Sequence, residues 1–297
     1  MDKQQFEQLA ADGHNRVPVW RTVLADLDTP LSVYLKLADG PDSFLFESVE
    51  GGESWARYSI IGLPARKRFT INDRTLATFE LGRQVSEETL DDPLAGIEAL
   101  RAAYRVPDLD ALPVFSGGLV GYFGYETVEL LEPRLRREGK VDEIGTDDIV
   151  LLLAEEVAVF DRHEGRLWLI VNADPSAPGA WEAAQRRLDQ LEHRLRSGST
   201  GYGLAVTGSA VGEGDFRYGF QKDDFLAAVA RSKEYILAGD IFQVVLSQRM
   251  SVPFDARPLD VYRALRALNP SPYMYFIDLG DTQIVGSSPE VLVRVQD

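Results

Sequence analysis

A Gln, a Ser and an Arg share one side of an otherwise apolar stretch, and together they could bind a polar ligand. The stretch is residues 238–250, Ala-Gly-Asp-Ile-Phe-Gln-Val-Val-Leu-Ser-Gln-Arg-Met. If it forms a strand, Gln243, Ser247 and Arg249 point to one face and Phe242 points into the core, because side chains alternate along a strand. A covered amide or guanidinium without a partner costs roughly 1–3 kcal/mol or more. The pattern therefore predicts either a ligand-lined cleft or a strand whose polar face meets water.

Two later stretches, taken with this one, carry a resemblance to a known family. They are Asn-Pro-Ser-Pro-Tyr-Met at 269–274 and Gly-Ser-Ser-Pro-Glu at 286–290. Similar motifs occur in the same order in the chorismate-utilising enzymes. The sequence closely resembles that family and, within it, the group called anthranilate synthase component I.

The resemblance implies catalytic roles for two residues. Glu290 matches the family's acidic residue beside the C4 hydroxyl of chorismate, where a carboxylic acid would protonate the departing oxygen. Gln243 lies where the water-adding relatives resemble one another in having a lysine. An amide cannot serve as that base, so Gln243 favours ammonia as the nucleophile at C2. Without the motifs, Glu290 would be interpreted as a surface residue after a turn and Gln243 as a glutamine bonded to backbone.

The resemblance also implies a reaction, a cofactor and a partner. Anthranilate synthase component I converts chorismate and ammonia to anthranilate and pyruvate with Mg²⁺, and a glutamine amidotransferase subunit supplies the ammonia. The family's metal-binding glutamates and active-site histidine are expected beyond Asp297, so this chain is expected to be an N-terminal portion that is inactive alone. Two alternatives stay open: aminodeoxychorismate synthase component I, which attacks C4, and a non-catalytic module that binds a ligand or partner.

A second site, for the inhibitor tryptophan, is implied by the similarity of Phe-Leu-Phe-Glu-Ser at 44–48 to the family's Leu-Leu-Glu-Ser element. An amino acid with an indole needs an acceptor for its ammonium, donors for its carboxylate and an apolar slot. The residues expected to provide these groups are Glu47, Ser48, Arg57, Pro272, Tyr273 and Met274.

Composition excludes several classes of function. The 297 residues are 45% apolar and 26% charged, and their formal net charge of −16 disfavours a nucleic-acid or anionic-membrane surface. There is no cysteine, and the three histidines, His14, His163 and His193, are too far apart in sequence to predict a histidine-built metal site. No apolar run is long enough to cross a bilayer, and the first residues lack the layout of a signal peptide. We expect a cytoplasmic protein.

The elements that would position these residues are mostly short antiparallel strands, together with several helices. Strands are expected at 32–37, 43–48, 57–61, 66–71, 75–81, 149–160, 166–171, 273–279 and 282–285. Helices are expected at 3–11, 92–104, 180–196, 223–239 and 258–268. The glycine-rich stretch 116–126 lacks a phosphate-binding motif, and we interpret it as close backbone approach inside a packed sheet.

The predicted fold is α+β, a mixed α/β body with antiparallel β-sheets around a central cleft and helices outside. The resemblance implies a truncated form of the anthranilate/aminodeoxychorismate synthase-type fold. Residues 197–219, rich in glycine and weakly patterned, are expected to be a linker. The linker would separate an N-terminal region, 1–196, which carries the tryptophan-site element, from the start of the chorismate-binding catalytic region, 220–297.

Overall fold

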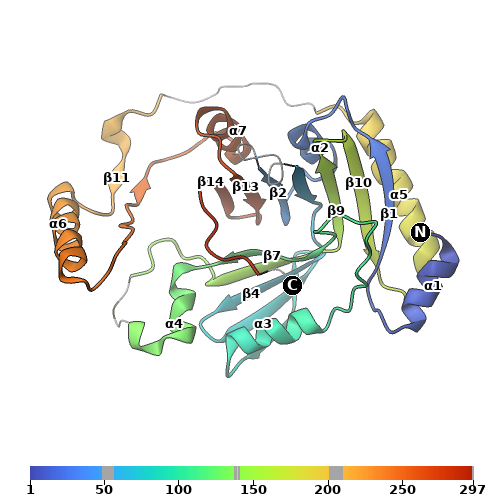
Figure 1. Ribbon diagram of the computed structural model, residues 1–297, viewed down its shortest axis with the longest axis horizontal. Coiled ribbons are helices and arrows are strands. Elements are labelled where there is room, and N and C mark those ends of the chain that lie inside the picture. Colours follow the sequence, from blue (N-terminus) through green and yellow to red (C-terminus); the bar gives the residue numbers. More distant parts are fainter. Residues whose placement is uncertain (49–56, 137–138, 140, 201–209, 296–297) are drawn as a thin grey trace. The chain divides into compact units, whose positions relative to one another are not determined.

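A computed structural model describes residues 1–48, 57–136, 139, 141–200 and 210–295 (Figure 1). The chain forms two compact units, which are considered separately. The first comprises Met1–Tyr202 together with Pro258–Asp297, and the second comprises Gly203–Arg257.

A seven-stranded antiparallel sheet is the centre of the first unit. Its strand order is β1-β10-β9-β3-β2-β13-β14. The strands are β1 (Val17–Leu24), β2 (Ser43–Glu47), β3 (Tyr58–Gly62), β9 (Glu156–Asp161), β10 (Arg166–Ala173), β13 (Tyr273–Asp278) and β14 (Gln283–Ser288). Because β2 pairs with β13, residues more than two hundred positions apart in sequence lie side by side, with Phe46 opposite Tyr275.

A five-stranded antiparallel sheet packs against one face of the larger sheet. Its order is β6-β5-β4-β8-β7. The strands are β4 (Lys67–Asn72), β5 (Thr75–Glu80), β6 (Arg83–Thr89), β7 (Gly118–Phe123) and β8 (Ile149–Ala154). Buried side chains from both sheets form one apolar cluster, which includes Phe44, Val120 and Ile170. This cluster holds the two sheets face to face.

Helices cover the outer faces of both sheets. They are α1 (Lys3–Ala11), α2 (Pro30–Leu37), α3 (Pro93–Ala102), the short α4 (Val128–Leu131), α5 (Ala180–Ser197) and α7 (Pro258–Leu268). Residues of α2, α5 and α7 form a second buried cluster with the larger sheet, exemplified by Leu188 and Tyr262. Side chains of α3, such as Ile97, pack on a third cluster over the smaller sheet. The predicted α+β class, with antiparallel sheets and helices outside, is confirmed.

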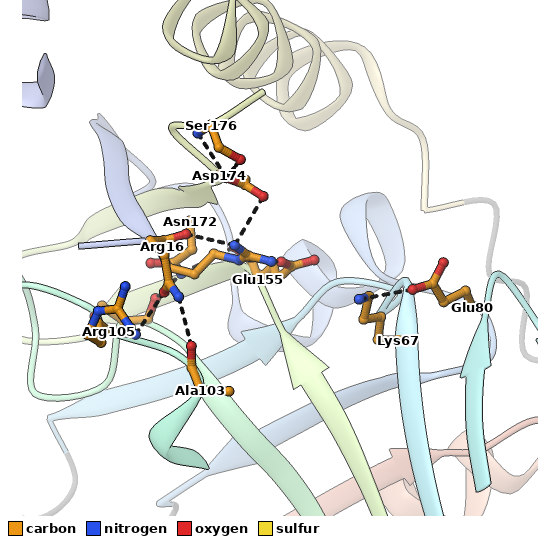
Figure 2. Close-up of polar contacts among 11 residues, drawn as sticks. Arg16, Lys67, Glu80, Ala103, Arg105, Glu155, Asn172, Asp174 and Ser176 are labelled. Carbon is orange, nitrogen blue, oxygen red and sulfur yellow. Dashed lines mark hydrogen bonds and ion pairs between the residues drawn. The ribbon is translucent and has the colours of Figure 1, made fainter. Parts of the chain in front are cut away.

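Residues 149–160, predicted as one strand, are two strands in different sheets. The chain leaves β8 in the smaller sheet, turns at Glu155 and enters β9 in the larger sheet. Arg16 stabilises the turn by donating from Nε to Glu155 Oε1 at 2.8 Å (Figure 2). The backbone N–H of Asn172 donates to the Glu155 carbonyl at 2.8 Å. All of β8 and all of β9 except Glu156 are buried, so the apolar pattern does not reveal the change of sheet.

Local signals explain the other differences from prediction. Residues 32–37, predicted as a strand, are helix α2, which begins with a capping box between Thr29 and Ser32 and has proline at its first turn. Strand β1 was missed because it contains Pro18, which an edge strand tolerates. Strand β6 was missed because it is exposed along its whole length and lacks an apolar face.

The second unit contains helix α6 (Lys222–Ala238), a 3₁₀ turn (Glu213–Asp215) and a two-stranded ladder of β11 (Arg217–Tyr218) and β12 (Met250–Ser251). Gly239 ends α6 at a φ of 82°, as predicted. The strand predicted within 238–250 is wrong for residues 240–249, and Phe242, predicted in the core, is 93% exposed. A strand needs a neighbour for its backbone groups, and among the described residues of this stretch only Met250, which pairs with Tyr218, has one.

Candidate functional site

A cavity of about 700 Å³ opens on the face of the seven-stranded sheet that meets β7. We call it the aromatic pocket. Its lining residues are Phe46, Glu47, Ser48, Tyr58, Ile60, Val114, Gly121, Tyr122, Phe123, Pro272, Tyr273, Met274, Tyr275, Ile277, Ile284 and Arg294. The volume is in the range of small-molecule sites, which are typically about 300–1,000 Å³.

Strand register gathers the aromatic and aliphatic wall. Phe46 of β2 lies opposite Ile60 of β3 on one side and opposite Tyr275 of β13 on the other. Directly opposed residues of antiparallel strands share a face, so these three side chains form one apolar surface. Tyr58 and Ile277, two positions along their strands, extend that surface because side chains recur every second residue.

Strand β7 forms the facing wall, and glycine brings it close to β8. A Cβ on Gly121 would lie 1.8 Å from the Val150 carbonyl oxygen, so only glycine permits this approach. The next residue, Tyr122, donates from its hydroxyl to the Asp147 carbonyl at 2.7 Å, and burial raises the pKa of this phenol. The predicted close backbone approach in 116–126 is thus confirmed at Gly121.

Five of the residues predicted for the inhibitor site border the aromatic pocket. They are Glu47, Ser48, Pro272, Tyr273 and Met274. Arg57 is not among the lining residues. Its guanidinium instead donates to Asp161 Oδ2 at 2.8 and 2.6 Å and to Glu164 at 3.1 Å. Whether any of these residues binds an inhibitor stays a prediction.

The Glu47 carboxylate lies on the opposite face of β2 from Phe46, among helix-side groups. Its Oε1 accepts from Arg162 Nη2 at 2.6 Å and from Arg266 Nη2 at 3.2 Å. Its Oε2 accepts from the Tyr262 hydroxyl at 2.6 Å and from Arg266 Nε at 3.0 Å. The side chain is fully buried, so both oxygens are engaged away from the pocket. By the same alternation, the Met274 side chain opposite Glu47 belongs to the helix-side core.

Three partners of Glu47 were missed by sequence reasoning, although one signal was present. The helix expected at 258–268 carries Tyr262 and Arg266 four residues apart, which places both on one stripe. An arginine on a buried helical stripe indicates a buried acidic partner. Arg162, in the turn after β9, gave no such signal. Burial, the nearby Glu47 charge and the hydrogen bond to it raise the pKa of Tyr262, so its hydroxyl stays a donor.

Two buried hydroxyls near the pocket lack partners among the described residues. Ser48 Oγ, on a residue that lines the pocket, and Ser271 Oγ, just before Pro272, are both inaccessible to solvent and accept or donate no hydrogen bond there. A buried hydroxyl without a partner costs roughly 1–3 kcal/mol. The Ser48 edge of the pocket is therefore suited to the polar end of a ligand whose apolar body fills the aromatic wall.

The two predicted catalytic residues are both exposed. Glu290 follows β14 in the first unit, where its carbonyl accepts from Ser288 Oγ at 2.9 Å. Gln243 lies in the second unit, in the segment after α6. Their roles stay predictions.

No group of three or more His, Asp or Glu side chains that could hold a metal occurs in the described part of the chain. No helix among them has the length and apolar character needed to span a membrane.

A further polar cluster, at the edge where the two sheets meet, is internally paired. Arg16 contacts Glu155 at 2.8 Å and Asp174 at 3.4 Å, and Lys67 contacts Glu80 at 2.9 Å (Figure 2). Its acidic and basic groups pair with each other across strand ends, which indicates a structural role.

Comparison with known proteins gives the family. Residues 48–297 match the family described as chorismate binding enzyme, and the chain belongs to that family. Over its whole length the chain is 51% identical to anthranilate synthase component 1 of Pseudomonas aeruginosa and spans 61% of that protein. Over 99% of its length it is 46% identical to anthranilate synthase component 1 of Neisseria meningitidis serogroup B, of which it spans 60%.

A solved structure gives the same relationship. The fold resembles the crystal structure of anthranilate synthase component I from Streptococcus pneumoniae TIGR4 with a TM-score of 0.65 and 30% sequence identity. The similarity covers 93% of this chain and 59% of that one. The chain thus corresponds to about three fifths of the length of the relatives it matches.

Proposed function

We propose that the chain is part of an anthranilate synthase component I, which converts chorismate and ammonia to anthranilate and pyruvate for tryptophan biosynthesis in the cytoplasm. The observation that carries the proposal is the 51% identity over the whole chain to a relative of that name. A glutamine amidotransferase subunit is the proposed source of ammonia. Aminodeoxychorismate synthase component I is the less favoured alternative, since the relatives reported above carry the other name.

The proposed chemistry makes Glu290 a proton donor and makes Gln243 a neutral residue beside the carbon that is aminated. Ammonia attacks C2 of chorismate while the C4 hydroxyl leaves as water, and Glu290 supplies the proton to that oxygen. The family resemblance assigns Gln243 to the C2 side of chorismate, where an amide would provide no base for activating water. Loss of the proton on C2 and cleavage of the C3–O bond then release the enolpyruvyl group as pyruvate and give the aromatic ring. Mg²⁺ is part of the proposal, but its ligands, expected beyond Asp297, are not assigned here, so the 297-residue chain alone is proposed to be inactive.

We also propose that the aromatic pocket is the site of feedback inhibition by tryptophan. An indole would lie against Phe46, Tyr275 and Tyr122, since aromatic rings supply large apolar contact area. The Ser48 hydroxyl, which has no partner among the described residues, and the backbone at Pro272 and Tyr273 would meet the ammonium and carboxylate.

Product identification tests the proposed reaction. The full-length parent protein is incubated with chorismate, Mg²⁺ and ammonium at alkaline pH, and products are separated by chromatography. Anthranilate that depends on ammonium is the expected product. An aminated product that retains its pyruvyl group and carries nitrogen at C4 would replace this proposal with the alternative enzyme.

A further inference from the structure

The Glu47 carboxylate joins three elements that meet at the edge of the aromatic pocket. It belongs to the end of β2, and its donors come from the turn after β9, through Arg162, and from α7, through Tyr262 and Arg266. These elements are far apart in sequence. We call these four residues the Glu47 clamp.

The clamp leaves no acceptor on Glu47 for a ligand. Each carboxylate oxygen already takes two hydrogen bonds, and Arg266 binds both oxygens in a bidentate pair. Such charge-assisted bidentate bonds are stronger and more directional than neutral ones. Removing one partner of a buried ion pair leaves the remaining charges uncompensated, which destabilises the arrangement. Glu47 therefore acts on the pocket through its partners and not by receiving an ammonium group.

The clamp reaches the pocket wall on two sides. On the first side, Arg162 Nη1 donates to the Ser48 carbonyl at 3.0 Å, and Ser48 lines the pocket. On the second side, α7 ends at Leu268, and the chain reaches the pocket residue Pro272 four positions later. The Asn269 carbonyl within this short connection accepts from Ser287 Oγ of β14 at 2.7 Å, so the connection is tied to the sheet.

We propose that the Glu47 clamp is a positioning device that couples occupancy of the aromatic pocket to the seating of α7 on the seven-stranded sheet. The inference rests on the proposed tryptophan site. A ligand that fixes Ser48 and Pro272 favours the closed clamp. Ser48 is held by the clamp residue Arg162, and Pro272 follows closely after α7, which the clamp holds on the sheet. Thermodynamic coupling is reciprocal. If a bound ligand raises the equilibrium constant for closing the clamp by some factor, opening the clamp lowers the affinity for the ligand by the same factor.

Arg266→Gln in the full-length parent tests the coupling, with Arg187→Gln as a matched control. Arg187 has the same side-chain exposure as Arg266, 33%, and also binds both oxygens of a glutamate, Glu156, on the helix-covered side of the sheet. It does not line the pocket. Tryptophan affinity is measured by titration calorimetry and the thermal midpoint by scanning calorimetry. We expect a loss of affinity of about tenfold or more for Arg266→Gln and less than about twofold for Arg187→Gln. The thermal midpoint is expected to fall further in Arg266→Gln, because Glu47 is fully buried whereas Glu156 is 24% exposed.

Hydrogen exchange supplies a readout that a merely structural role would not change. In the unsubstituted protein and in Arg187→Gln, tryptophan should slow amide exchange across α7, whereas in Arg266→Gln it should not. Tyr262→Phe, which removes only the hydroxyl, serves if Arg266→Gln does not fold, and it should show the same loss of coupling in smaller degree.

The outcomes separate the two proposals. Equal tryptophan affinity in Arg266→Gln and the unsubstituted protein, or equal protection of α7, would overturn the clamp while leaving the tryptophan site intact. No tryptophan binding by the unsubstituted parent would overturn the proposed ligand, and the clamp inference with it. Equal weakening by Arg187→Gln would show a general effect of stability and would also overturn the clamp.

Discussion

Substituting Gly121 with alanine should strain the strand that forms one wall of the aromatic pocket. The added Cβ would lie 1.8 Å from the Val150 oxygen, 2.8 Å from its carbonyl carbon and 3.0 Å from Leu151 Cα. All three are backbone atoms of β8, which cannot rotate away as a side chain could. Ordinary contact begins at 3.4 Å, so β7 and β8 must separate locally by roughly 1.6 Å.

The expected cost follows from overpacking. Inserting a methyl group into a close-packed site costs roughly 1–3 kcal/mol. At roughly 2–4 °C per kcal/mol for a domain of this size, a cost of about 2 kcal/mol lowers the thermal midpoint by about 4–8 °C. Because Gly121 also lines the pocket, tryptophan binding should weaken in the same variant.

Differential scanning calorimetry of the parent protein checks this expectation. Gly214→Ala is the matched control, since its Cβ would meet no heavy atom within 4 Å, and its midpoint should stay within about 1 °C of the unsubstituted value. A Gly121→Ala midpoint within about 1 °C of the unsubstituted protein would refute the tight approach of β7 to β8.

Three further predictions concern the pocket, the catalytic residues and pH. Ser48→Phe should raise the tryptophan concentration needed for half-inhibition about tenfold or more while chorismate turnover stays within about twofold, because the ring fills the polar edge of the pocket; unchanged inhibition would contradict the site. Gln243→Lys should lower ammonia-dependent anthranilate output, and normal kinetics would show that Gln243 does not line the reacting face. Burial alone would raise the pKa of Asp161. Hydrogen bonds from Arg57 and from two backbone amides outweigh burial, so the pKa of Asp161 is lowered. Because the pKa of Asp161 is lower in the folded than in the unfolded protein, ionised Asp161 stabilises the fold at pH values above its unfolded-state pKa near 3.9. This stabilisation is lost as the pH falls through the folded-state pKa. Urea unfolding should therefore show a stability gap between the unsubstituted protein and Asp161→Asn that narrows below about pH 4, and a gap independent of pH would contradict the ion pair's role.

Elements with local chemical signals could be predicted from the sequence. Helix α3 begins where Asp92 accepts from the amides of Leu94 and Ala95, and α6 ends at a left-handed Gly239, as the residue types indicate. The strand predicted within 238–250 was based on alternation of side chains and had no capping or turn residue to support it. Its formation depends on a neighbouring strand, which periodicity cannot supply.

Five of the sixteen residues that line the candidate site were predicted from the sequence, but the direction of their side chains was not. Glu47 and Ser48 were placed beside Pro272–Met274 through the family resemblance, and the structure brings them to one cavity. Which way Glu47 points could not be predicted, because its strand is covered on both faces and its apolar residues do not alternate with polar ones. Arg162 comes from a turn more than a hundred residues away in sequence, and only the register of β2, β3 and β9 brings it to Glu47.

Crystals of the parent protein grown with tryptophan would test most directly the claim that this chain carries the inhibitor site of a chorismate-utilising enzyme. The account predicts indole density against Phe46, Tyr275 and Tyr122, with the amino-acid end at Ser48 and Pro272 and the Glu47 carboxylate still bound by Arg162 and Arg266. Tryptophan bound elsewhere with this cavity empty, or its ammonium bound directly to the Glu47 carboxylate, would contradict the account.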